Sequence, residues 1–173
     1  MRHSPKSKKI AVRTVSPRKK PGAAKPKAHR GGVVRFCVRG ADGASGAKNF
    51  TPSRLVEMLQ VGLPFGELQD LQASLAIPTE RLAPMLGISK ATFHRRKGRA
   101  GTLPPAVSDR VLRYARLLGQ ALKVFGGPGA ANLWLNSPQV GLGGALPLDY
   151  ARTELGAREV ENLLGRIEYG VYS

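Results

Sequence analysis

PTERLAPMLGISKATFHRRK, residues 78–97, has the spacing of two short helices joined by a tight turn. The first helix would turn Leu82, Met85 and Leu86 inward. Gly87 supplies the turn, because glycine adopts left-handed backbone conformations at little cost. Ser89 stands where a hydroxyl can cap the second helix. The stretch therefore predicts a helix-turn-helix.

The second helix of this motif carries basic and polar side chains on its outer face. Residues 79–99 hold six Lys/Arg against one acid, a formal charge of +5. An ordinary pair of antiparallel helices with a solvated basic face is the alternative, but the capped turn and the clustered charge favour DNA docking. The candidate DNA-binding residues are Ser89, Lys90, Thr92, His94, Arg95, Arg96, Lys97 and Arg99.

On both sides of residues 78–97, apolar residues recur at helical spacing along the chain. The expected helices cover 52–61, 64–75, 104–125, 130–135, 147–154 and 157–168. Strand alternation is not seen after residue 50, so we expect an all-α fold. Residues 33–39 are β-prone, but the stretch is too short for us to expect a stable strand.

The charge of the chain is concentrated near its N-terminus. The 173 residues carry +17, of which +13 lies in residues 1–48. We expect residues 1–49 to form a disordered basic tail and linker, because they contain too few large apolar residues to offset ordering entropy. Such a tail either aids solubility, reflects a misassigned start codon, or adds non-specific phosphate contacts. The rest divides into an expected helix-turn-helix domain, 50–126, and a smaller helical domain, 127–173.

Several classes of protein do not fit this composition. One Cys and three His are too few for a disulfide framework or a zinc site, and we expect neither a metal nor a cofactor. The sequence shows neither a transmembrane run nor a secretory signal, so we expect no membrane partner. His94 has no visible acid or nucleophile beside it, and the glycines at 141–144 lack the Lys-Ser/Thr ending of a phosphate loop. We therefore expect a protein that is not an enzyme.

Four segments in the C-terminal third, taken in order, carry a family resemblance. They are ANLWLNSP at 131–138, LGGALPLD at 142–149, GAREV at 156–160 and LGRIEYGV at 164–171. With the preceding helix-turn-helix, residues 50–173 resemble the Xre/ParS-type antitoxins, the bacterial partners of RES-domain toxins. The ordered set is specific where any single segment would be weak.

The resemblance implies an Xre-like helix-turn-helix domain followed by a toxin-binding domain. It implies neutralisation of an NAD-depleting RES toxin, with the antitoxin's C-terminal end near the toxin's active site, and repression of the shared operon. The toxin-binding candidates are Trp134, Arg166, Tyr169, Gly170, Val171 and Tyr172. Trp134 alone would fit a core position better than an interface.

The resemblance also sets the expected partners and location. They are a RES-domain toxin and operator DNA, in a homodimer or a hetero-oligomer with the toxin, in the cytoplasm and at the nucleoid when DNA is bound. The alternative is a stand-alone transcription factor or nucleoid-associated protein that uses the basic tail as its main anchor.

Overall fold

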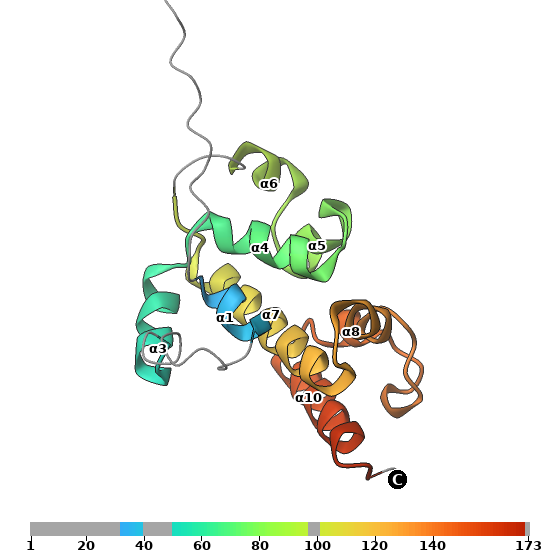
Figure 1. Ribbon diagram of the computed structural model, residues 1–173. Coiled ribbons are helices and arrows are strands. Elements are labelled where there is room, and N and C mark those ends of the chain that lie inside the picture. Colours follow the sequence, from blue (N-terminus) through green and yellow to red (C-terminus); the bar gives the residue numbers. More distant parts are fainter. Residues whose placement is uncertain (1–31, 40–49, 97–100, 172–173) are drawn as a thin grey trace, which may run out of the picture.

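The computed structural model describes residues 32–39, 50–96 and 101–171, and the regular elements in these ranges are helices. The all-α prediction is therefore confirmed. In chain order the elements are α1 (Val33–Arg39), α3 (Pro52–Val61), α4 (Phe65–Leu75), α5 (Thr79–Met85), α6 (Lys90–Arg96), α7 (Pro105–Phe125), α8 (Pro128–Leu135), the 3-10 turn η1 (Val140–Leu142), α9 (Pro147–Tyr150) and α10 (Glu154–Glu168) (Figure 1). Among the described helices, none is long and apolar enough to cross a membrane.

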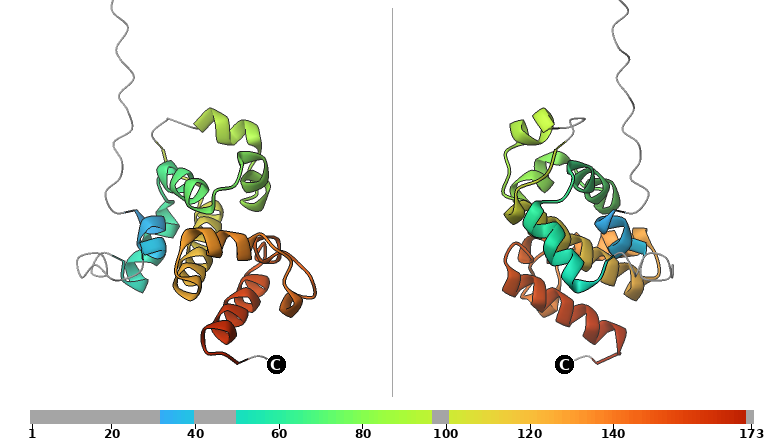
Figure 2. Two further views of the ribbon diagram at one scale, coloured as in Figure 1. Left: turned by 45° about the vertical axis from the view of Figure 1, so that its right-hand side comes forward. Right: turned by 90° about the vertical axis from the view of Figure 1, so that its left-hand side faces the viewer.

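Helix α7 is the centre of the molecule. It has 21 residues, and nine of them are buried, among them Tyr114, Leu117 and Leu118. Helices α1, α3 and α4 pack on α7, and so do α8 and α10 from the C-terminal third. Figures 1 and 2 show α6 at one end of the molecule and the end of α10 at the other.

Helix boundaries agree with the sequence where a cap or a proline marks them. Thr51 caps α3 as predicted, its Oγ1 accepting a hydrogen bond from the N–H of Arg54 at 3.4 Å. Helix α10 begins three residues before the expected 157, because Thr153 caps it and accepts from the N–H of Gly156 at 3.1 Å. Helix α9 correspondingly ends at Tyr150 rather than at 154. The Thr153 cap was not predicted from the sequence.

Residues 33–39 form no strand, as expected, but they form a helix, α1, so their assignment to the disordered segment 1–49 is wrong. Val33 and Val34 are completely buried, and their N–H groups donate to the two carboxylate oxygens of Glu67 at 3.0 and 2.9 Å. Arg35 adds an ion pair with Asp70 at 3.2 Å. These contacts with α4, together with packing on α7, outweigh the local preference of a Val-rich sequence for strand. Residues 1–31 and 40–49, for which we expected a disordered tail and linker, lie outside the described residues.

Gly119 on α7 allows the close approach of α1. A Cβ at Gly119 would collide with the backbone carbonyl oxygen of Cys37. Gly165 on α10 is the matched case, since a Cβ there would meet nothing within 4 Å.

We predict that Gly119→Ala lowers the free energy of unfolding by about 1–3 kcal/mol, because the added methyl group pushes against a backbone atom that cannot move away alone. Gly165→Ala should instead raise it by about 0.5–1 kcal/mol through helix propensity. Urea denaturation of both variants measures the difference. Equal effects of the two substitutions would contradict the close packing of α1 on α7.

Candidate functional site

Helices α5 and α6 form the predicted helix-turn-helix. Gly87 has φ +66° in the turn, and Arg110 of α7 lies against it, its Nη1 donating to the carbonyl of Leu86 at 2.9 Å. Ser89 caps α6 as predicted, because its Oγ accepts from the N–H of Thr92 at 3.1 Å. Phe93 is completely buried and packs edge-on against Phe65 of α4, with ring centroids 5.8 Å apart. The turn of the motif is therefore attached to α7, and its second helix is attached to α4.

The outer face of α6 brings together some of the predicted DNA-binding residues. Lys90, His94 and Arg95 are exposed, and Lys90 and His94 stand one turn apart on the same face. The hydroxyls of Ser89 and Thr92 lie 2.9 Å apart and bond to each other, so these two residues shape the start of the helix. Arg96 belongs to α6, while Lys97 and Arg99 lie outside the described residues.

Arg81, one of the six basic residues counted in 79–99, faces away from this surface. It lies on α5, and its guanidinium donates to the side-chain oxygen of Asn136 and pairs with Asp149 at 3.6 Å. Asn132 adds a second link from α8, donating to the carbonyl of Ser74 at 3.1 Å. Arg81 therefore joins the helix-turn-helix to the C-terminal third and does not add charge to α6.

Helix α8 attaches to the end of α7 through apolar side chains. Ala131 and Leu135 are completely buried, and Trp134 is half-buried against Phe125, with ring centroids 5.5 Å apart. Trp134, a predicted toxin-binding residue, thus contributes to the core while keeping part of its ring accessible.

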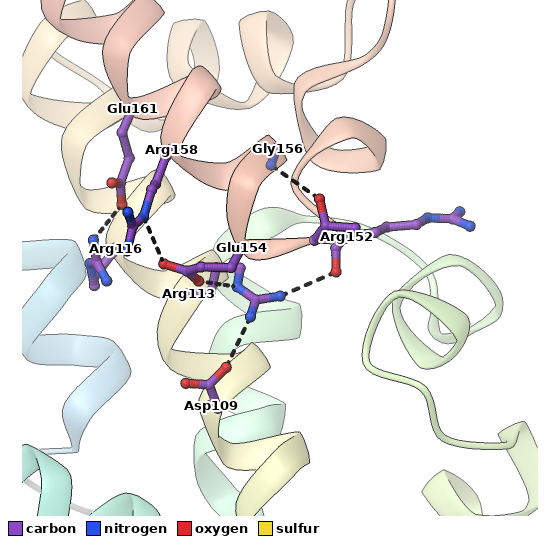
Figure 3. Close-up of polar contacts among 9 residues, drawn as sticks. Asp109, Arg113, Arg116, Arg152, Glu154, Gly156, Arg158 and Glu161 are labelled. Atoms are coloured by element: carbon purple, nitrogen blue, oxygen red, sulfur yellow. Dashed lines mark hydrogen bonds and ion pairs between the residues drawn. The ribbon is translucent and has the colours of Figure 1, made fainter.

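A cluster of charged side chains fixes α10 along α7 (Figure 3). Arg113 donates to Asp109 at 3.0 Å, to Glu154 at 3.0 Å and to the carbonyl of Arg152 at 3.2 Å. Its side chain is 12% exposed, so these bonds form in a largely desolvated position. One turn further along α7, Arg116 pairs with Glu161 at 2.7 Å.

Tyr114 completes the junction from the buried side of α7. Its hydroxyl donates to the carbonyl of Leu148 at 3.3 Å, and burial raises the pKa of Tyr114 to about 12. The phenol therefore stays protonated and keeps this bond at physiological pH.

Helix α10 ends in a defined turn that displays the predicted C-terminal residues. Gly170 has φ +67°, the N–H of Gly170 donates to Ile167 at 3.2 Å, and the N–H of Val171 donates to Arg166 at 2.9 Å. This pattern is a Schellman motif, which confirms the expected stop at Gly170. Tyr169 is 79% and Val171 55% exposed, and Arg166 is exposed as well. Tyr172 lies outside the described residues.

Four exposed apolar or aromatic residues of the C-terminal third were not among the predicted site residues: Leu133, Val140, Tyr150 and Leu155. Leu133 on α8 is 71% exposed and Val140 in η1 is 96% exposed. Leu133 could have been found, because it lies between Ala131 and Leu135 and so points away from their buried face. Val140 lies in a glycine-rich stretch without periodicity, where the sequence carries no such signal. Within the described ranges, His, Cys, Asp and Glu do not gather into a group that could hold a metal ion.

Comparison with known families places both halves of the chain. Residues 54–116 match the antitoxin Xre-like helix-turn-helix domain, and residues 120–170 match the antitoxin Xre/MbcA/ParS C-terminal toxin-binding domain. Both matches meet on α7, the helix that the two halves share.

Relatives that are named as antitoxins agree with these two family matches. An antitoxin Xre of Yersinia enterocolitica is 33% identical over 120 residues, 69% of this chain and 81% of the relative. An antitoxin Xre of Photorhabdus laumondii is 32% identical over 67% and 79% of the two chains. A Prs ADP-ribosylating antitoxin of a Sphingobium species is 25% identical over 71% and 83%.

These matches define the class: an antitoxin of a toxin–antitoxin system, with a DNA-binding helix-turn-helix and a domain that binds a toxin. The chain belongs to the Xre/MbcA/ParS antitoxin family. The match to a toxin-binding domain favours an antitoxin over the stand-alone transcription factor that the sequence left open.

Arg113 and Arg158 provide a matched pair for the α7–α10 junction, because both contact Glu154. Arg113→Ala should lower the free energy of unfolding by about 1–2 kcal/mol, since it removes three hydrogen bonds made by a side chain that is itself only 12% exposed. Arg158 is 70% exposed and 3.6 Å from Glu154, so Arg158→Ala should change stability by less than about 0.5 kcal/mol. Urea denaturation compares them, and similar losses would contradict the account of the junction.

Proposed function

We propose that this chain represses its own operon through α6 and neutralises a RES-domain, NAD-depleting toxin by occluding its active site with the end of α10. Residues 50–126 would form the DNA-binding domain and 127–173 the toxin-binding domain, with the basic segment 1–49 in front. Both activities belong in the cytoplasm, at the nucleoid when operator DNA is bound. Neither role requires a catalytic residue in this chain.

The DNA-binding half of the proposal rests on the exposed face of α6. Lys90 and His94 would enter a major groove, because an α-helix fits that groove and presents one ridge of side chains to the base edges. Arg95, and by sequence Arg96, Lys97 and Arg99, would hold phosphates or guanine edges. Ser89 and Thr92 would act indirectly by fixing where α6 begins.

Repression also requires a second copy of this helix. A single α6 of seven residues reads one half-site, and operators of helix-turn-helix proteins are two half-sites about one turn of DNA apart. We therefore propose a homodimer or a toxin-bridged hetero-oligomer on DNA. Its symmetry would bring two α6 helices to two successive major grooves.

The toxin-binding half rests on one observation, the aromatic end of α10. The Schellman turn holds the backbone at residues 166–171 and presents Tyr169 and Val171 to solvent. Large apolar side chains on a narrow, fixed end can insert into a partner's cleft with little loss of entropy. Tyrosine is also among the residues that dominate binding energies at interfaces. Arg166 would contact the rim of the toxin's cleft, and Tyr172 would lengthen the inserted end of the chain.

NAD chemistry in the partner is supported by the four-segment resemblance and by one relative. The Sphingobium relative is named for ADP-ribosylation, a reaction class that consumes NAD. To inhibit such a toxin, the end of α10 has only to occupy the NAD site and keep the dinucleotide out. This steric occlusion requires no reaction by the antitoxin.

For the DNA site, we predict that Lys90→Ala combined with Arg95→Ala weakens binding to the DNA upstream of the gene and lowers the salt slope by about 1 for each of the two side chains that contacts a phosphate. Arg152→Ala combined with Arg158→Ala removes the same charge from exposed positions near α10 and should leave the slope unchanged. Fluorescence anisotropy over a range of salt concentrations measures both. Equal slopes for the two double variants would show that α6 is not the DNA contact.

For the toxin site, we predict that Tyr169→Asp combined with Val171→Asp abolishes protection of cells that express the toxin encoded beside this gene. A carboxylate at either position has to be desolvated on entering an apolar cleft. Val61→Asp, at a 75% exposed position on α3, is the matched control and should protect fully. Growth and cellular NAD content are the readouts. Full protection by the Tyr169/Val171 variant would contradict occlusion by the end of α10.

A further inference from the structure

Helix α3 contributes less to the core than any other helix in the part of the chain that the structure describes. Each of the other described helices has at least one buried residue, and α3 has none. Half of its ten residues are nevertheless apolar, and Val61 at its end is 75% exposed. Amphipathic helices gain most of their stability from burial of an apolar face, so α3 leaves a face that a partner can cover.

A groove with a volume of about 380 Å³ runs along one side of α3. Four residues of α3 line it, and their spacing of i, i+3, i+4 and i+7 places them in one stripe: Arg54, Glu57, Met58 and Val61. The remaining lining residues follow α3 or precede α7: Gly62, Leu63, Pro64 and Thr102. Apart from Arg54, Glu57 and Thr102, the lining residues carry no polar side chain. The groove therefore suits an apolar side chain between two charged ones.

The backbone at residues 62–63, on one side of this groove, is fixed by its surroundings. The N–H of Leu63 donates to the hydroxyl of buried Ser108 at 2.9 Å, and the carbonyl of Leu63 accepts from the N–H of Leu103 at 2.7 Å. Gly62 has φ +99°, and a Cβ there would collide with the carbonyl oxygen of Leu103. The groove therefore exists before a partner arrives, and its occupation costs little ordering entropy.

The charges beside the groove are complementary to themselves. The whole chain carries +17, so two copies repel each other at long range. Arg54 and Glu57 cancel along the groove, and their side chains lie 3.6 Å apart and are 65% and 66% exposed. In a two-fold interface the same surface meets itself, so Arg54 of one copy can pair with Glu57 of the other, and the reverse. Exposed Val61 can likewise enter the groove of the other copy.

The position of α3 suits a dimer that binds DNA. Figure 1 shows α6 at the top of the molecule and α3 on its left side. A two-fold axis that runs beside α3 keeps both α6 helices on the same side of the dimer, as two successive major grooves require. The exposed residues at the end of α10 do not meet this requirement. They lie at the far end of the molecule, and pairing through them would turn the two α6 helices away from each other (Figure 2).

We infer that α3 and its groove form a two-fold interface between two copies of this chain, with Val61 of each copy seated in the groove of the other. This inference rests on the proposed reading of two half-sites by α6. It makes the homodimer, rather than a toxin bridge, the unit that binds both half-sites. Burial of the apolar side chains supplies the affinity, while Arg54 and Glu57 exchange partners across the axis and fix the register of the two copies.

The first test measures self-association of the full chain without DNA, by sedimentation velocity over a range of protein concentrations. The unchanged chain should sediment as a dimer in equilibrium with monomer. Val61→Asp should raise the dimer dissociation constant at least about tenfold, because a carboxylate has to be desolvated in each groove. Val56→Asp is the matched control, since Val56 is 53% exposed on the same helix and does not line the groove. It should change the constant by less than about twofold.

The second test exchanges the charges beside the groove. Arg54→Glu alone and Glu57→Arg alone should each weaken self-association about fivefold, because each places like charges opposite each other across the axis. An equimolar mixture of the two variants should recover the affinity of the unchanged chain to within about threefold, since every pair in the mixed dimer is again of opposite sign. Mixing cannot repair a variant that fails to fold, so recovery reports contact between the two copies.

Three results would overturn the inference: a chain that stays monomeric at every concentration, equal effects of Val61→Asp and Val56→Asp, or no recovery in the mixture. Loss of toxin protection by Val61→Asp with an unchanged dimer would also overturn it, and would show that the toxin occupies the groove.

Failure of the underlying DNA proposal looks different. The dimer and its response to these variants would then persist, while Lys90→Ala with Arg95→Ala would leave binding to the upstream DNA unchanged. If both proposals hold, Val61→Asp should weaken binding to that DNA and Val56→Asp should not.

Discussion

The burial of α7 from two directions is the constraint on which the rest of the structure depends. One part of the helix supports α1, α3 and α4, and the other supports α8 and α10. The residues Val111, Tyr114 and Leu118 of α7 are at most 1% exposed. Neither half therefore has a complete core without this helix. The family matches meet on it, at residues 116 and 120, which fits a helix that belongs to both domains.

Polar contacts then set the relative position of the two halves. Arg113 fixes the start of α10, and Arg81 and Asn132 join the helix-turn-helix half to α8 and α9. Unlike apolar packing, such bonds demand specific directions, so they define one arrangement among those that α7 alone would allow. The result is a body with α6 at one end and the exposed turn after α10 at the other, which leaves room for each of the two proposed partners.

The sequence predicted those parts of the fold that local spacing determines. Helix α7 and the helix-turn-helix follow from apolar residues at helical spacing, and Gly87 and Ser89 mark the turn and the cap. Helix α1 was missed because its Val-rich sequence favours strand, while its stabilising partner Glu67 lies more than thirty residues away. The caps and turns of α10 show the same contrast, since Gly170 was predicted and Thr153 was not.

The candidate sites show the same contrast between features that local sequence determines and features that long-range contacts determine. The exposed face of α6 followed from its cap and its charge, and the exposed end of α10 followed from the family resemblance. Arg81 could not be placed from sequence, because its charge suggested DNA while its partners, Asn136 and Asp149, are brought near only by the tertiary fold. Long-range pairing of this kind leaves no local pattern, which limits what spacing and composition can predict.

We propose that two separate ends of one body serve two partners. Hydrogen–deuterium exchange of the full chain, alone, with upstream DNA and with the neighbouring toxin, tests it most directly. DNA should slow exchange in α6 and leave residues 166–171 unaffected, and the toxin should slow exchange at 166–171 and leave α6 unaffected. Protection of the same helix by both partners, or of neither end by its own partner, would contradict the account.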